Sequence, residues 1–235
     1  MQRALLLSVL ALASVGCDAH LMHPVLFYGD SQACVEESLA KHDDDGDGGR
    51  TWALAHAQFE SACLDGHDAA ACSALGVMLE QGRGVEVDIA QAVALYQRAC
   101  DDENARGCYH LGRAHVSGYA LDANVGVAMG LFESSCKRGV EAACRELASL
   151  WVTSGGPGDV ERASELFEHS CDQGDVRSCY ELGVMVAGGE MTRDDFRAYT
   201  LLEKACVHSI DDSCARLALI QARMVALRDV HANRH

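Results

Sequence analysis

Residues 72–100 read CSALGVMLEQGRGVEVDIAQAVALYQRAC, and variants of this stretch recur along the 235-residue chain. A cysteine opens the stretch and another closes it. Five times two cysteines stand eight or nine residues apart, as Cys63/Cys72, Cys100/Cys108, Cys136/Cys144, Cys171/Cys179 and Cys206/Cys214. The first members of these pairs follow one another at intervals of 37, 36, 35 and 35 residues. A constant period of this length is typical of solenoid repeats.

Two helices per repeat follow from alignment on the cysteines. After the second cysteine of each pair, Leu stands three residues on and Gly or Ala four residues on, as in Leu75-Gly76 and Leu182-Gly183. These positions form one stripe of a helix, here named helix A. A mid-helix Gly costs about 1 kcal/mol relative to Ala, so its recurrence indicates close packing with another helix. Four residues before the first cysteine stands Tyr96, Phe132, Phe167 or Leu202, which predicts a second helix, helix B.

The repeat resembles that of a known protein family. The residues that carry the resemblance are Leu75-Gly76, Gly82-Arg83-Gly84-Val85, Asp88, Ala92, Tyr96 and Ala99-Cys100. They are similar to the Sel-one-like repeat, a short helical relative of the tetratricopeptide repeat. The cysteine pairs resemble the secreted, cysteine-rich bacterial branch of that family, and the pattern covers about residues 33–220. The resemblance implies an all-α fold, an α/α superhelical repeat solenoid whose helices A line a concave face.

The organisation predicted for the chain has four parts. Residues 1–16 form a lipoprotein-type signal peptide, 17–30 a tether, 31–208 five repeats, and 209–235 a capping helix with a tail. Arg3 precedes an apolar run, and Ser14-Val15-Gly16-Cys17 resembles a bacterial lipoprotein cleavage box, although Leu is usual where Ser14 stands. Cys17 is therefore the expected lipid attachment site, with ordinary signal cleavage as the alternative. We expect an exported protein, periplasmic or a lipoprotein of the inner or outer bacterial membrane.

Export bears on the chemistry of the cysteines. In an oxidising compartment, regularly paired cysteines predict disulfides, which here would join each helix B to the next helix A. In a reducing compartment metal would be the alternative, but zinc ligands usually stand two to four residues apart. Cys34 has no partner at the repeat spacing, which leaves it as a free thiol, an intermolecular bridge or a small buried residue.

Composition limits the partners. The formal net charge of −16 argues against binding nucleic acid and against adhesion of the folded body to anionic lipid. Contact with a membrane is expected only through the N-terminal lipid. A weak candidate calcium site is formed by Asp43, Asp45 and Asp47, but Leu54 stands where the closing Glu belongs. A solvated turn is the alternative, and no cofactor is predicted.

Partner-binding residues are predicted from the helical geometry. Positions two and five after the second cysteine of a pair point away from the packing stripe of helix A. They include His110, Arg113, Glu146, Ser149 and Glu181. On the concave face that the resemblance implies, they would contact a protein or peptide ligand, or a cell-wall fragment. Any exposed helix face would show the same mixture of polarity.

An enzymatic alternative comes from the resemblance. Some secreted cysteine-rich relatives are described as penicillin-binding or β-lactamase-like, chemistry that needs a nucleophilic Ser one helical turn from a Lys. Ser38-x-x-Lys41 and Ser134-x-x-Lys137 have that spacing, but neither Ser-Asp-Asn nor Lys-Thr-Gly follows. We therefore expect a binding scaffold rather than an enzyme, with a β-lactam- or peptidoglycan-acting hydrolase as the alternative.

Overall fold

The computed structural model describes residues 48–189, 194–210 and 212–232. Within these ranges the chain contains ten helices and no strand, so the predicted all-α class is confirmed. The helices are α2 (Gly48–Leu64), α3 (Ala69–Gln81), α4 (Ile89–Asp101), α5 (Ala105–Ser117), α6 (Val125–Lys137), α7 (Glu141–Ser154), α8 (Asp159–Asp172), α9 (Val176–Gly188), α10 (Asp195–Val207) and α11 (Ser213–Ala232). The odd-numbered helices from α3 onward are helices A, and the even-numbered ones are helices B, in which the first cysteine of a pair is the next-to-last residue.

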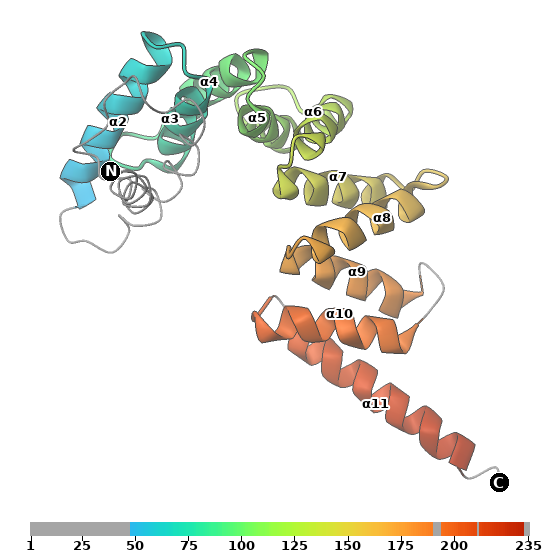
Figure 1. Cartoon of the computed structure of the whole chain (residues 1–235). Helices are drawn as coiled ribbons and strands as arrows, with labels where there is room; N and C mark the ends of the chain where they lie inside the picture. Colours follow the sequence, from blue (N-terminus) through green and yellow to red (C-terminus); the bar gives the residue numbers. More distant parts are fainter. Residues whose placement is uncertain (1–47, 190–193, 211, 233–235) are drawn as a thin grey trace, which may run out of the picture. The chain divides into compact units, whose positions relative to one another are not determined.

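The described residues form two compact units. The first runs to Ala114 and includes Gly118–Asp122, and the second comprises His115–Ser117 and the residues from Ala123 on. In the first unit α3 packs between α2 and α4. In the second, each helix from α6 to α11 packs against the next, as Figure 1 shows.

Short polar caps fix where six of the described helices begin, and glycines lie at the ends of helices A. The N-cap side chains that accept hydrogen bonds from the first turn belong to Asp68, Asp88, Asn104, Asn124, Asp175 and Asp194. At the other end of α3 and α7, Gly82 and Gly155 have φ angles of 69° and 64°. Glycine adopts this left-handed conformation without a Cβ clash, so the chain can turn into the next helix B.

The core follows the stripe predicted for helix A. Leu75, Leu111, Leu147 and Leu182 are all at most 3% exposed, and the helix B anchors Tyr96, Phe132, Phe167 and Leu202 are at most 2% exposed. A Cβ on Gly76 would lie 2.6 Å from Cε1 of Tyr96 and 3.2 Å from the Ala92 carbonyl oxygen. The recurrent small residue therefore has the packing role predicted for it.

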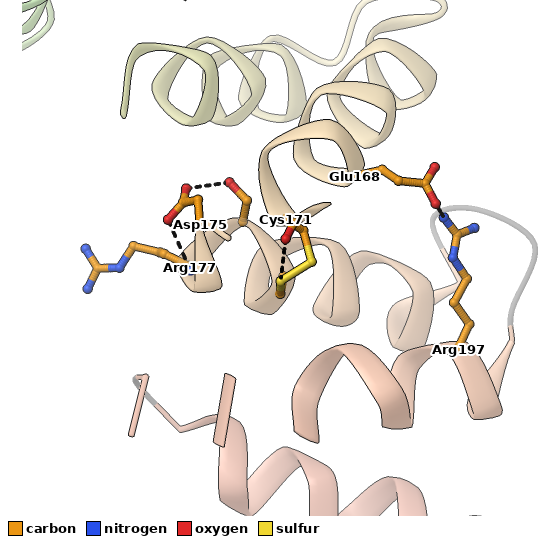
Figure 2. The surroundings of a disulfide bond; sticks show 7 residues. Glu168, Cys171, Asp175, Arg177 and Arg197 are labelled. Carbon is orange, nitrogen blue, oxygen red and sulfur yellow. Dashed lines mark hydrogen bonds and ion pairs between the residues drawn. A yellow bond between two sulfur atoms is a disulfide. The ribbon is translucent and has the colours of Figure 1, made fainter. Parts of the chain in front are cut away.

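Disulfides join each even-numbered helix to the helix A that follows. The pairs are Cys63–Cys72, Cys100–Cys108, Cys136–Cys144, Cys171–Cys179 and Cys206–Cys214, with S–S distances of 1.94–2.09 Å and Cα–Cα distances of 4.5–4.8 Å. Figure 2 shows the bridge at Cys171, between α8 and α9. In the chain-entropy model, a bridge closing a loop of this length contributes roughly 2.5 kcal/mol.

Several predicted features lie outside the described residues. They are the lipidation site Cys17, Cys34, the Ser38/Lys41 pair, and Asp43, Asp45 and Asp47 of the candidate calcium loop. That loop would continue to Leu54, whereas α2 is already helical from Gly48. The limits predicted for the signal peptide, tether and repeats stay predictions.

Candidate partner-binding surface

The five predicted partner-binding residues lie on three helices A. His110 and Arg113 are on α5 in the first unit, whereas Glu146 and Ser149 on α7 and Glu181 on α9 belong to the second. The Arg113 side chain is 47% exposed, and the other four residues are half-buried. All five thus reach solvent to some degree, and Arg113 does so most.

The His110 side chain lies between α4 and α5. Its ring stacks on Tyr96, with ring centroids 4.7 Å apart and an interplanar angle of 15°, and it meets the Tyr109 ring edge-on. Burial, with the nearby charges of Arg113 and Arg106, lowers the pKa of His110 to about 3. Its Nδ1 atom is buried without a hydrogen-bond partner among the described residues. At neutral pH His110 is therefore an uncharged aromatic surface.

Glu80 of α3 contacts both Tyr96 and Arg113. The Tyr96 hydroxyl donates a hydrogen bond of 2.6 Å to Oε2 of Glu80, and Arg113 Nη2 lies 3.8 Å from Oε1 of the same carboxylate. The Arg113 guanidinium also lies 5.9 Å from the centroid of the Tyr109 ring. Burial and the Glu80 carboxylate raise the pKa of Tyr96, so its hydroxyl remains a donor. Glu80, Tyr96, His110 and Arg113 are named the Glu80 cluster below.

Glu80 is not among the residues predicted from the sequence, although a signal exists. It stands eight residues after the second cysteine, where the other repeats have Val116, Val152, Ala187 and Ala222. Among the helix B anchors Tyr96, Phe132, Phe167 and Leu202, only Tyr96 carries a hydroxyl group. The carboxylate and the hydroxyl that depart from the repeat pattern are hydrogen-bonded to each other.

In the second unit, polar contacts link successive helices A. Arg145, which directly follows Cys144, makes an ion pair of 2.9 Å with Asp175, and the two side chains are 19% and 16% exposed. Asp175 is the N-cap of α9 and also accepts a hydrogen bond of 2.7 Å from the Ser178 hydroxyl. Tyr180, which directly follows Cys179, donates a hydrogen bond of 2.6 Å to Asp212 before α11. Tyr180 therefore adds a polar contact between α9 and the residue that precedes α11.

Helices B of the second unit have their own contact. Arg197 of α10 pairs with Glu168 of α8 at 2.5 Å, and Figure 2 shows this pair and Asp175 at opposite ends of α9. The Arg145–Asp175 pair thus connects helices A of neighbouring repeats, and the Arg197–Glu168 pair connects their helices B. Glu146, Ser149 and Glu181 are then presented by helices whose positions the flanking repeats fix.

The hydrolase alternative gains no matching geometry at Ser134. Lys137 Nζ lies 2.7 Å from Oε1 of Glu133, and the lysine side chain is 72% exposed. The ammonium is thus an ion-pair partner on the helix surface. Groups of three or more His, Cys, Asp or Glu able to hold a metal do not occur within the described ranges. Nor does any described helix combine the length and apolarity that crossing a bilayer requires.

Repeating helix pairs, short turns and a disulfide at each junction define a helical repeat protein. The Sel1 repeat model matches residues 69–104, 105–140, 142–175 and 176–206, more than half of the chain. The chain belongs to the Sel1 repeat family. Each matched segment begins at or next to the start of a helix A and continues through the following helix B.

Solved structures show the same fold. A Sel1 repeat protein from Oxalobacter formigenes is 19% identical with a TM-score of 0.69, the match covering 86% of this chain and 82% of that one. A protective antigen of uropathogenic Escherichia coli with an SLR fold is 22% identical with a TM-score of 0.65. That match covers 84% of this chain but only 43% of the antigen's length. An immunity protein from Pseudomonas aeruginosa is 22% identical with a TM-score of 0.52, covering 81% and 70% of the two chains. No curated protein matches the sequence.

Proposed function

We propose that this protein is an exported, lipid-anchored scaffold of the cell envelope that binds a protein or peptide partner through the exposed sides of its helices A. The Sel1 repeat fold is suited to protein–protein interaction. Five disulfides are what an oxidising compartment permits, which supports export.

The observation that carries the proposal is the Glu80 cluster. Arg113 presents a half-exposed guanidinium next to a carboxylate and two aromatic rings, and each of these groups comes from a well-packed helix. Because these groups are already ordered, binding them costs little side-chain entropy. Arginine and tyrosine are also the residue types that contribute most often to binding hot spots.

Affinity capture from envelope extract tests the proposal. The full chain is compared with Arg113→Glu, alone and combined with Glu181→Arg, and with the matched charge reversal Lys204→Glu at an exposed position of helix B α10. The expected result is one or more proteins retained by wild type and Lys204→Glu but lost with Arg113→Glu. Identical retention by all variants would contradict the proposal.

Lipid anchoring is tested separately at Cys17, which lies outside the described residues. We expect Cys17→Ser to move the protein from the membrane fraction to the soluble fraction and to remove incorporation of a labelled fatty acid. Membrane association that persists in this variant would contradict the anchor without bearing on partner binding.

We propose a binding protein rather than an enzyme. The hydrolase alternative predicts hydrolysis of a chromogenic β-lactam that Ser38→Ala or Ser134→Ala abolishes. We expect no hydrolysis by the wild-type protein.

A further inference from the structure

Helix α5 carries two basic and two aromatic side chains on one face. Arg106, Tyr109, His110 and Arg113 stand at positions i, i+3, i+4 and i+7, which share one face of a helix. Each of them is at least partly exposed, and the Arg113 side chain is 47% exposed. These four residues are named the α5 stripe below, and all of them belong to the first unit.

The rings in the middle of the α5 stripe form an aromatic surface between the two arginines. The Tyr109 and His110 ring centroids lie 5.1 Å apart with an interplanar angle of 63°, and the His110 ring also stacks on the buried Tyr96. The Arg113 guanidinium lies 5.9 Å from the centroid of the Tyr109 ring. The stack on Tyr96 holds the His110 ring in a fixed orientation, so the aromatic surface is formed before any partner binds.

The α5 stripe is positive, although the whole chain has a net charge of −16. Burial lowers the pKa of His110 most, and the positive charges of Arg113 and Arg106 lower it further. Burial also lowers the pKa of Arg106, so its guanidinium lies in a partly desolvated position. Glu80 offsets part of the Arg113 charge, which leaves two guanidiniums against one carboxylate. An added carboxylate would interact with these cations more strongly than it does in bulk water.

This charge is specific to α5 among the described helices A, because only α5 has two basic residues and no acidic residue at these positions. The equivalent residues are Ala70, Ser73, Ala74 and Val77 for α3; Ala142, Arg145, Glu146 and Ser149 for α7; Arg177, Tyr180, Glu181 and Val184 for α9; and Asp212, Ala215, Arg216 and Leu219 for α11. In the second unit, Arg145 and Arg216 form ion pairs with Asp175 and Asp212. The positive face is therefore a property of one repeat.

The spacing of the two arginines fits an extended peptide. Arg106 and Arg113 are seven residues apart on α5, which corresponds to a rise of about 10.5 Å along the helix axis. In a polyproline II helix, every third residue lies on the same side, about 9.3 Å apart. Carboxylates at such positions would reach both guanidiniums, and the residues between them would lie over the Tyr109 and His110 rings. Aromatic surfaces are where polyproline II segments commonly dock.

We propose that the α5 stripe binds an extended acidic segment of the partner protein, with carboxylates on Arg106 and Arg113 and the intervening residues against the Tyr109 and His110 rings. An acidic partner refines the proposed function and rests on it, because both involve the surface around Arg113. The arginine–carboxylate hydrogen bonds would select acidic residues, and the aromatic contact would favour proline between them.

A peptide probe tests the proposal on the full, disulfide-bonded chain. The probe repeats the unit Glu-Pro-Pro and carries fluorescein, and the matched control repeats Gln-Pro-Pro. The measurement is fluorescence anisotropy during titration with the protein. We expect saturable binding of the glutamate peptide and at least about tenfold weaker binding of the glutamine peptide, because the charge-assisted hydrogen bonds are lost. This comparison changes only the ligand and therefore does not depend on the folding of a variant.

Protein variants locate the site. Arg106→Gln and Arg113→Gln should each weaken binding of the glutamate peptide about fivefold, because each removes one charged donor. Arg113→Lys keeps the charge and should retain most of the binding, which a purely structural role of Arg113 would not predict. Lys204→Gln, at an exposed position of α10, is the control and should bind the peptide as wild type does.

The outcomes separate the acidic partner from the proposed function. Equal binding of both peptides, binding of neither, or equal binding by wild type and Arg113→Gln would overturn the acidic partner. If peptide binding is absent but envelope proteins are captured by wild type and lost with Arg113→Glu, only the acidic partner is overturned and the proposed function stands. Equal capture of envelope proteins by wild type and Arg113→Glu would contradict the proposed function and the acidic partner with it.

Discussion

The hydroxyl of Tyr96 donates a 2.6 Å hydrogen bond to the Glu80 carboxylate across the α3–α4 pair, sixteen residues away in the chain. Tyr96 is 2% exposed, so this hydrogen bond satisfies the hydroxyl of a side chain that otherwise packs in the apolar core. The same carboxylate lies 3.8 Å from Arg113, so the core of the α3–α4 pair contacts a residue of the candidate partner-binding surface.

Removal of this hydroxyl should destabilise the protein. We expect Tyr96→Phe to lower the free energy of unfolding by about 2 kcal/mol, because it removes a buried hydrogen bond to a charged acceptor. The matched control is Tyr199→Phe, which loses an exposed bond of 3.3 Å to Glu203 and should cost less than about 0.5 kcal/mol. Urea denaturation with the disulfides intact measures both. Equal effects would contradict the role given to Glu80.

The close approach of α3 and α4 makes Gly76 sensitive to any side chain. A Cβ at Gly76 would meet both the Tyr96 ring and the Ala92 backbone, so Gly76→Ala should cost about 2 kcal/mol through overpacking. In contrast, Gly130 of α6 has nothing within 4 Å of an added Cβ. There, Gly130→Ala should raise stability by about 0.5–1 kcal/mol through helix propensity. Thermal unfolding of the two variants gives shifts of opposite sign.

The stability of the first unit should fall as the pH falls below 6.5. The pKa of His110 is about 3 in the folded protein and 6.5 in the unfolded chain, so between these values the unfolded chain binds the extra proton. The contribution of His110 is therefore complete above pH 6.5 and is lost at up to about 1.4 kcal/mol for each pH unit toward pH 3. Arg113 and Arg106 reinforce the effect, because their charges oppose protonation.

Comparison with variants isolates this histidine from the carboxylates that titrate in the same range. His110→Phe keeps an aromatic ring against Tyr96 and should flatten the pH dependence of unfolding between pH 6.5 and 4.5. His169→Phe, at an exposed position of α8, should leave the pH dependence as in wild type. Parallel curves for wild type and His110→Phe would show that the imidazole is not held neutral.

The link between α7 and α9 should depend more on Asp175 than on Arg145. The Asp175 carboxylate forms an ion pair with Arg145 and accepts hydrogen bonds from the Ser178 hydroxyl and the backbone N–H of Arg177. Asp175→Ala therefore removes all three contacts. We expect a loss of about 2–3 kcal/mol, against about 1 kcal/mol for Arg145→Ala. Urea denaturation measures both losses. A larger effect of Arg145→Ala would contradict this assignment of the contacts.

Local features of the fold could be predicted because they repeat. The cysteine spacing, the Leu and Gly positions of helix A and the anchor of helix B recur at one period, and each reports the same packing environment several times. Glu80 could not be found in this way, because its role depends on departures from the repeat. The repeat register puts His110 on a helix A, whereas its stacking on Tyr96 depends on how α4 and α5 meet.

The sequence by itself determined the repeat register, the helical class and which cysteines can pair, because these depend on spacing along one chain. Tertiary structure decided that Arg113 is held by Glu80, that the Arg145 side chain reaches Asp175, and that Ala218 remains open while Ala148 is buried. The physical reason is that exposure and side-chain contacts depend on which helix lies opposite. The sequence of α11, which repeats the Cys-x-x-Leu pattern of the other helices A, does not show that Ala218 is exposed.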